Sequence, residues 1–193
     1  MQVLDSRLAH LPIHSLRSGA SLGFIDDPII DPRQLKIIAF YCSNTHIPEP
    51  AILHSTDIRE IGNMGVIIDD EEVIMPPDDL VRTQQVMDYN FVLLDKLVID
   101  TQKRRLGKIE SYSIDVSSFY IVKLNVRQSA FKNLWGSSLS IDRTQIVEVT
   151  DSKIVVQSPE IREESPQHIL QNPFRQHGGE TTQPNMIRSH QED

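Results

Sequence analysis

The sequence predicts an all-β protein of two tandem small β-modules, joined by a short helical linker and followed by a disordered C-terminal tail. Up to Ser158, apolar stretches of four to eight residues alternate with turn-forming Asp-Pro, Gly, Asn and Ser clusters. Much of this pattern occurs twice along the chain. After Ser158 the composition becomes polar and rich in Pro and Gln, so this tail cannot bury enough apolar surface to offset its chain entropy.

The internal repeat defines the two modules. A shift of 84 residues superimposes a leucine–glycine step, an isoleucine–aspartate step and a long apolar strand, aligning residues 22–25, 30–31 and 35–40 with 106–109, 114–115 and 119–124. A shift of 88 aligns residues 56–61 and 66–68 with 144–149 and 154–156. Self-similarity of this kind is typical of a duplicated supersecondary unit. We expect the first module in residues 1–79 and the second in residues 91–158, with residues 159–193 as the tail.

The long strand of each module shows which side chains we expect to be buried. In the second module, strand alternation predicts a buried face formed by Tyr120, Val122, Leu124 and Val126. The shift of 84 transfers this register to the first module and predicts burial of Ile38, Phe40 and Cys42. It leaves Ile37, Ala39 and Tyr41 on an apolar outer face. Such a face has to be covered by the other module, by a helix or by a partner.

Two further elements follow from local sequence signals. Residues 80–90 are expected to form the helical linker, because prolines and acidic residues precede them as they do at helix starts. Gly23 and Gly107 occupy the same place in the two repeats, which predicts a turn or bulge with positive φ or a close backbone approach. The acidic run Asp69–Glu72 lies between two apolar stretches and is interpreted as a solvated hairpin turn.

With this order of strands and motifs established twice, the sequence resembles the PRC-barrel family. This small β-barrel is shared by the photosynthetic reaction-centre H subunit and the C-terminal part of the bacterial ribosome maturation factor. The matching stretches are 16–42 with 51–68 and 97–126 with 140–156. The resemblance implies two PRC-like β-barrels and a non-catalytic docking role. The chain lacks the membrane helix of the first relative and has a second PRC-like copy where the ribosome factor has a different barrel, so neither specific role is carried over.

Composition favours a soluble cytoplasmic protein. The chain has 193 residues, a formal charge of −8 and 39% hydrophobic residues, and it shows neither a signal peptide nor a membrane-spanning apolar run. Cys42 is the single cysteine, which excludes an internal disulfide and fits a reducing compartment.

The motifs do not indicate an enzyme. The sequence contains no HExxH, EF-hand, GxSxG or GxGxxG pattern, so we expect no catalytic residue, metal or cofactor. We therefore expect an adaptor that binds a protein partner or a second copy of itself. Ile37 and Tyr41 on the apolar strand face, with Phe131 and Trp135 in the enlarged second loop, are the candidate contact residues. A cleft between the modules would leave an enzymatic role open.

The alternative is an RNA- or ribosome-associated factor. Basic side chains near the aromatic residues of the second module could hold a nucleic-acid backbone while a base stacks; they are Lys103, Arg104, Arg105, Lys108, Arg127 and Lys132. The acidic pI near 5.3 argues against a dedicated nucleic-acid binder. A charged turn that protects a β-protein from edge-to-edge pairing explains the same residues.

Overall fold

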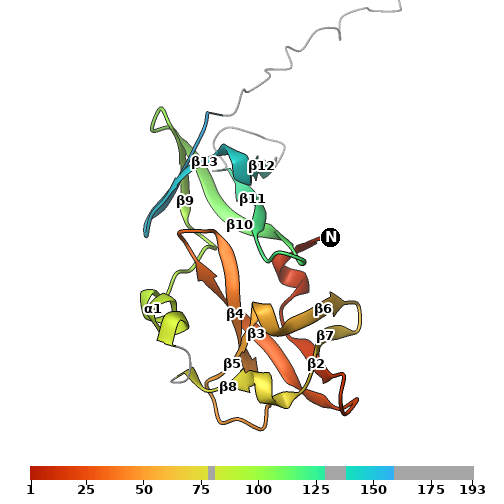
Figure 1. The fold of residues 1–193 in the computed structure, drawn as a ribbon. Coiled ribbons are helices and arrows are strands. Elements are labelled where there is room, and N and C mark those ends of the chain that lie inside the picture. Colours follow the sequence, from red (N-terminus) through yellow and green to blue (C-terminus); the bar gives the residue numbers. More distant parts are fainter. Residues whose placement is uncertain (78–80, 129–137, 159–193) are drawn as a thin grey trace, which may run out of the picture. The chain divides into compact units, whose positions relative to one another are not determined.

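A computed structural model describes residues 1–77, 81–128 and 138–158 of the chain, which form one compact unit (Figure 1). The first sheet has the strand order β6-β7-β2-β3-β4-β5-β8. Its strands are β2 Leu11–Ser15, β3 Ser21–Asp31, β4 Lys36–Ser43, β5 Ala51–His54, β6 Ile58–Gly62, β7 Gly65–Ile68 and β8 Ile74–Met75. All pairings in it are antiparallel except that of β2 with β7.

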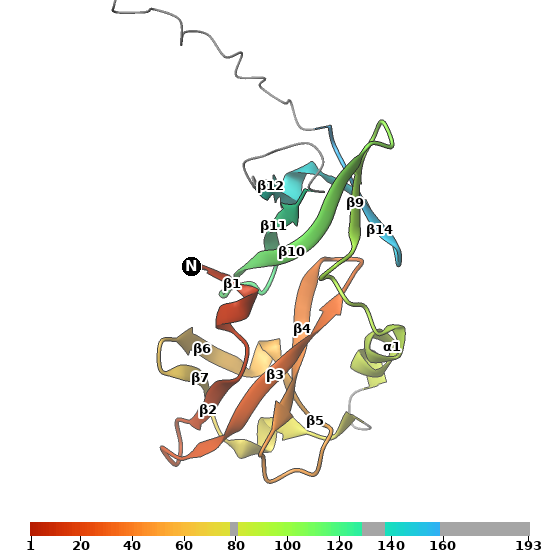
Figure 2. The ribbon, with the colours of Figure 1, turned by 180° about the vertical axis from the view of Figure 1, so that it is seen from behind.

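The second sheet has the order β12-β11-β10-β9-β14-β13. Its strands are β9 Leu97–Asp100, β10 Arg105–Asp115, β11 Ile121–Arg127, β12 Ser138–Asp142, β13 Ile146–Val149 and β14 Lys153–Val156. Here the parallel pair is β9 with β14. The N-terminal strand β1, Gln2–Leu4, pairs with the far end of β10, so the first residues of the chain belong to the second sheet (Figure 2).

The two sheets repeat one topology. Strands β6-β7-β2-β3-β4-β5 correspond in order to β13-β14-β9-β10-β11-β12, and each module has one parallel pair at the same place. Strand β10 begins and ends 84 residues after β3, while β14 pairs with β9 through Ile154 and Val98 as β7 pairs with β2 through Val66 and Ile13. The 3₁₀ turns Ser55–Asp57 and Arg143–Gln145 are separated by the second shift, 88 residues.

The β-rich class is confirmed, whereas the closed barrels are not. Within the described residues each module is an open, curved sheet whose first and last strands are not paired with each other. The two inner faces share one hydrophobic core that contains buried side chains from both modules. Phe40 of β4 and Phe119, just before β11, meet edge to face with ring centroids 6.3 Å apart. Packing of the two modules on each other therefore buries apolar surface that closure of each sheet would otherwise cover.

The helix expected in the linker is present as α1, Val81–Tyr89. It covers the outer face of the first sheet, where Val86 and Met87 pack against a small cluster formed by Ile29, Ala39 and Ile52. His54 Nε2 lies 2.7 Å from the Thr83 hydroxyl and joins the helix to β5. The apolar outer face predicted for β4 is thus real, and a helix of the same chain covers part of it.

The predicted strand register is correct at one end of each long strand and wrong at the other. Phe40, Cys42, Leu124 and Val126 are buried in the shared core as predicted. Ile37 and Ile121 are fully buried, although the alternation placed Ile37 on the outer face and favoured Ile38 and Val122 for the core. The pairings of β3 with β4 and of β10 with β11 each contain a register shift near this end, and such irregularities exchange the two faces of a strand.

Two other local predictions have opposite outcomes. Gly23 and Gly107 have φ values of +127° and +150°, which confirms the positive φ predicted for this position. The hairpin predicted around Asp69–Glu72 is wrong. Residues Glu71–Val73 form a 3₁₀ turn, and the following strand β8 pairs with β5 at the opposite side of the sheet. Asp70 accepts a hydrogen bond from the amide of Glu72, which redirects the chain out of the hairpin path.

Candidate functional site

The junction between the modules is held by a reciprocal pair of backbone hydrogen bonds. The amide of Ile37 donates to the carbonyl of Phe119, and the amide of Ile121 donates to the carbonyl of Leu35, both at 2.9 Å. Lys36 and Tyr120 form the antiparallel bridge between these bonds. Because each partner lies 84 residues from its counterpart, the contact has the self-complementary pattern of a two-fold axis.

Arg143 closes one side of this junction. Its guanidinium donates to the backbone carbonyls of Gln34, Leu35 and Ile121 at 2.5–3.2 Å, and it lies over the Tyr120 ring at 4.8 Å from the centroid. The Asp142–Gln145 capping box fixes the 3₁₀ turn that carries it. Arg143 therefore binds the 34–35 turn of the first module to the second module.

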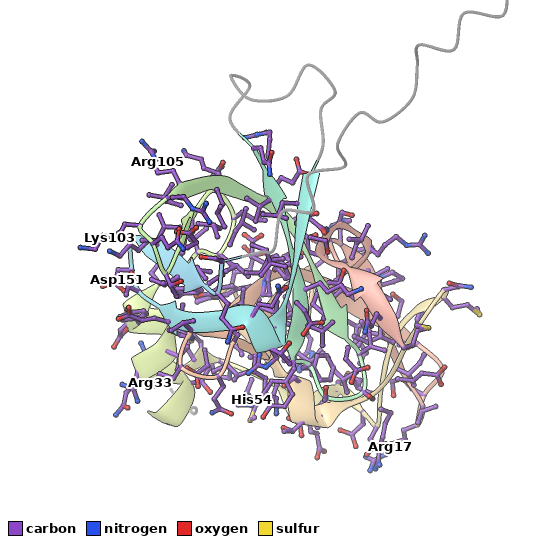
Figure 3. All side chains as sticks on the ribbon, turned by 90° about the horizontal axis from the view of Figure 1, so that it is seen from above. Arg17, Arg33, His54, Lys103, Arg105 and Asp151 are labelled. Carbon is purple, nitrogen blue, oxygen red and sulfur yellow. The ribbon has the colours of Figure 1, made fainter. Side chains whose placement is uncertain are left out.

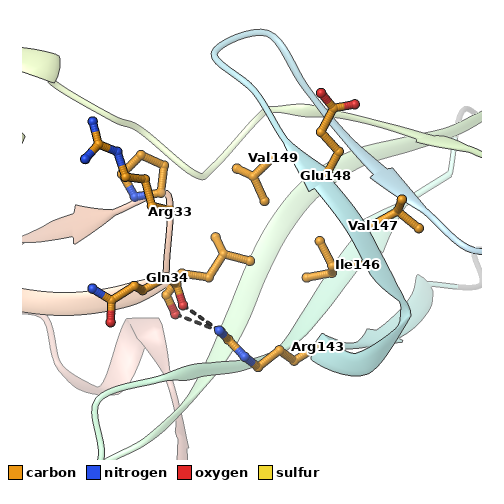
Figure 4. A pocket seen from close by; sticks show the side chains of 9 residues that line it. Arg33, Gln34, Arg143, Ile146, Val147, Glu148 and Val149 are labelled. Carbon is orange, nitrogen blue, oxygen red and sulfur yellow. Dashed lines mark hydrogen bonds between the residues drawn. The ribbon is translucent and has the colours of Figure 1, made fainter.

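A groove lies beside Arg143, between the turn that follows β3 and strand β13 (Figure 4). Its cavity has a volume of about 250 Å³ and is lined by Pro32, Arg33, Gln34, Leu35, Arg143 and residues 146–149. A second hollow of about 260 Å³ continues it toward α1, because it shares Pro32, Arg33 and Val149 and adds Val86 and Tyr89. We call the two hollows together the junction groove. Ile146 and Val149 face the 32–35 turn across it.

Strand β13 forms one wall of the junction groove and is also an edge of its sheet. In the described part of the chain it pairs only with β14. A register shift between Ile146 and Glu148 leaves Val147 as the bulged residue, and 56% of its surface is exposed. Open strand edges accept an added strand, and the exposed Val147 offers an apolar contact at this edge.

The predicted protein-contact residues differ in where the structure places them. Ile37 is fully buried in the core, so the expectation that it contacts a partner is corrected: the irregularity in the β3–β4 pairing turns its side chain inward. Tyr41 is half-buried and packs with the outer-face cluster covered by α1. Phe131 and Trp135 lie outside the described residues.

Two of the predicted basic residues are brought together on neighbouring strands. Lys108 and Arg127 are directly opposite in the β10–β11 pair, and both are exposed. Lys103 and Arg105 extend outward from the β9–β10 connection (Figure 3). Arg104, whose side chain is half exposed, donates from Nε to the buried carboxylate of Asp100 at 2.6 Å and so holds the turn. Lys132 lies outside the described residues.

Metal-ligand clustering and the state of the single cysteine can be read from the described residues. No three His, Cys, Asp or Glu side chains among them group as metal ligands. Cys42 is buried, and burial, with a smaller contribution from the charge of Asp26, raises the pKa of its thiol to about 12. A thiol with such a pKa is a small core hydrophobe and a poor nucleophile at neutral pH. None of the helices in the described ranges is long and apolar enough to cross a lipid bilayer.

Comparison with known proteins finds no family whose sequence model matches the chain and no significantly similar curated protein.

The sequence arguments missed Arg143, Val147 and Val149. The signal that identifies Arg143 is a difference between the repeats: the shift of 88 places Arg143 opposite Ser55, while the flanking Thr-x-Ile-x-Glu pattern is shared. At this position the two copies differ in structure, because Arg143 reaches across the junction to carbonyls of the other module.

Proposed function

We propose that the chain is a non-catalytic docking module with two PRC-barrel-like copies, whose junction groove receives an extended segment of a protein partner. The observation that carries this proposal is the coincidence of the junction groove with the open edge of β13. Added strands gain affinity from backbone hydrogen bonds and specificity from pockets for alternate side chains. The groove supplies such a pocket between Pro32, Leu35 and Val149.

The groove favours an apolar segment over a highly charged one. Its walls carry proline, leucine, isoleucine and valine side chains, and its charged groups are of both signs, with Arg33 on one wall and Glu148 on the other. The Arg143 guanidinium already donates hydrogen bonds to backbone carbonyls of the 34–35 turn. An extended segment with alternating apolar residues therefore fits better than an acidic or basic tail.

Selection from a random phage-displayed peptide library tests the proposal. We expect enriched peptides with alternating apolar residues that lose at least about tenfold in affinity on Val147→Asp, because a buried unpaired carboxylate disrupts the contact. Met64→Asp is the matched control, since Met64 is 82% exposed on the β6–β7 turn of the other module. Absence of enrichment, or equal loss in both variants, contradicts the proposal. Concentration-dependent dimerisation that only Val147→Asp abolishes assigns the groove to a second copy instead.

RNA binding is the second candidate. It is favoured by the exposed pair Lys108 and Arg127, with Lys103 and Arg105 nearby in sequence between β9 and the start of β10. If these side chains bind phosphates, the logarithm of affinity for single-stranded RNA falls linearly with the logarithm of salt concentration. Neutralising Lys108 and Arg127 together then reduces the slope by about 1.4. Neutralising Arg104, which is held by Asp100, is the comparison. A response that does not change with salt excludes this function.

A further inference from the structure

The two-fold relation at the junction gives the groove a counterpart on the other side of the Lys36–Tyr120 bridge. The shifts of 84 and 88 carry Pro32, Arg33, Gln34 and Leu35 onto residues 116–119, and Arg143, Ile146 and Val147 onto Ser55, Ile58 and Arg59. Those counterparts line a separate cavity of about 420 Å³, together with Lys36, Thr56 and Tyr120. We refer to it as the Ser55 cavity.

The two cavities differ most clearly at the position of Arg143, whose counterpart is Ser55. On the groove side the Arg143 side chain occupies the junction and binds three carbonyls. On the other side its counterpart is Ser55, which is too short to reach across, and the Ser55 cavity is the larger of the two equivalents. Among the described residues, no side chain donates to the carbonyl of Ser118, the counterpart of the Gln34 carbonyl that Arg143 binds.

Several polar groups in the Ser55 cavity have no protein partner. Ser55 is only 4% exposed, yet its hydroxyl makes no hydrogen bond within the described residues. The hydroxyls of Thr56 and Tyr120 are likewise without a hydrogen bond there. The Lys36 ammonium has the Tyr120 ring at 5.2 Å as its contact and no carboxylate partner in the described part of the chain. Ser55 is the buried member of this group, whereas Thr56 is exposed and Lys36 and Tyr120 are half-buried. These donors are therefore open to a ligand that enters the cavity.

The charge of the lining determines which ligand fits. Lys36 and Arg59 line the cavity, and among the described residues no carboxylate does. Arg59 donates two hydrogen bonds to Asp69, at 2.8 and 2.7 Å. Its contribution to the cavity is therefore mainly a positive electrostatic potential. Ser117 and Ser118 donate to the carboxylate of Asp115, which is not among the lining residues. One ammonium and three free hydroxyl donors suit an oxyanion with several acceptor oxygens.

We propose that the Ser55 cavity binds the phosphate group of a phosphate monoester. Lys36 supplies the charge, and the hydroxyls of Ser55, Thr56 and Tyr120 donate to the phosphate oxygens. The phosphate belongs either to a small metabolite or to a phosphorylated side chain of a protein. This site is separate from the junction groove and does not depend on the docking proposal.

The test is a titration of the full ¹⁵N-labelled chain, followed by amide chemical shifts at constant ionic strength. The probes are inorganic phosphate, glycerol 3-phosphate and a phosphoserine tripeptide. We expect saturable shifts confined to Ser55, Thr56 and residues 116–120. Preference for glycerol 3-phosphate assigns the site to metabolites, and preference for the tripeptide assigns it to phosphoproteins. Shifts that do not saturate, or that spread over Lys103 and Arg105, overturn the proposal.

Three variants make the assignment specific. Ser55→Ala and Lys36→Gln are each expected to weaken binding about tenfold, because each removes a donor to a charged group. Ser55→Arg reproduces the Arg143 arrangement in the second cavity and should abolish binding while the spectrum remains that of a folded protein. Lys153→Gln, in β14 and outside the cavity lining, is the control. Wild-type affinity in Ser55→Ala and Ser55→Arg overturns the proposal even if Lys36→Gln fails to fold.

Discussion

Lys36 and Tyr120 face each other across the junction of the two modules, and they occupy equivalent positions in the two repeats, 84 residues apart. The bridge they form is therefore where a duplicated unit meets its own copy. Their different chemistry breaks the symmetry: the aromatic ring receives the Lys36 ammonium and also the Arg143 guanidinium, whose counterpart is a serine. This backbone contact thus has the Arg143 side chain on one side and the Ser55 cavity on the other.

The first prediction concerns the glycine shared by the repeats. A Cβ at Gly107 would overlap the carbonyl oxygen of Arg127, and one at Gly23 would overlap that of Ser43, its counterpart. Both glycines also have positive φ, which an L side chain rarely adopts. Gly107→Ala is expected to lower the free energy of unfolding by at least about 2 kcal/mol, measured by urea denaturation.

Gly19→Ala provides the comparison for this prediction. Gly19 has a φ of +69° but no atom within 4 Å of the Cβ position. Its substitution carries the backbone strain alone, about 1 kcal/mol. Equal effects of Gly19→Ala and Gly107→Ala would show that the close strand approach at Gly107 is unimportant.

The second prediction concerns Arg143. Arg143→Met keeps much of the apolar stem but leaves the carbonyls of Gln34, Leu35 and Ile121 without its hydrogen bonds. We expect a loss of about 2 kcal/mol in the free energy of unfolding. Arg33→Met, an exposed neighbour on the same groove, should stay within about 0.5 kcal/mol of wild type. A loss of similar size in both variants would argue against a specific role for Arg143 at the junction.

Sequence reasoning succeeded where the backbone itself constrains the residue type. Gly23 and Gly107 are needed at one strand crossing, and Asp31 and Asp115 both accept hydrogen bonds from the turns that follow them. Such residues recur at fixed positions in both copies, so the shift of 84 locates equivalent strands. The duplication could be inferred in this way, but not the open sheets, because closure depends on packing between modules that no local pattern records.

Side-chain orientation and the cavities were harder to predict. Alternation has a period of two, and a single irregularity opposite Ile37 exchanges its face with that of Ile38. The cavities depend on residues from opposite modules, such as Lys36 and Ser118, that are distant in sequence and meet only at the junction. The repeat contains a usable signal at Ser55 and Arg143, since the aligned residues differ there in size and charge.

The third prediction is a dependence of stability on pH. Hydrogen bonds from the hydroxyls of Ser118 and Ser117, and one from the amino group of Met1, hold the pKa of Asp115 well below its usual range. A carboxyl whose pKa is depressed in the folded state stabilises the protein above the unfolded-state pKa of about 4, and this contribution is lost as the pH falls toward the folded-state value.

Asp115→Asn checks this dependence. The variant should be less stable than wild type at pH 7, and the difference should shrink steadily as urea denaturation is repeated from pH 5 down to pH 2. Asp151→Asn is the control, because the exposed Asp151 carboxylate accepts no hydrogen bond within the described residues. A stability difference for Asp115→Asn that stays constant with pH contradicts the assignment.

The last prediction is that Cys42 is protected from thiol reagents in the folded protein. Its side chain is buried in the shared core, and burial raises the pKa of the thiol to about 12. A shift of this size lowers the thiolate fraction at pH 8 roughly a thousandfold relative to an exposed cysteine, and steric access falls as well. We expect the reaction with a disulfide reagent to be slow in native buffer and complete within seconds in concentrated urea.

The variant Met64→Cys adds an exposed thiol on the β6–β7 turn, which should react rapidly in the folded state while Cys42 does not. Modification of both thiols at the same rate in native buffer would mean that the core around Phe40 and Cys42 opens readily.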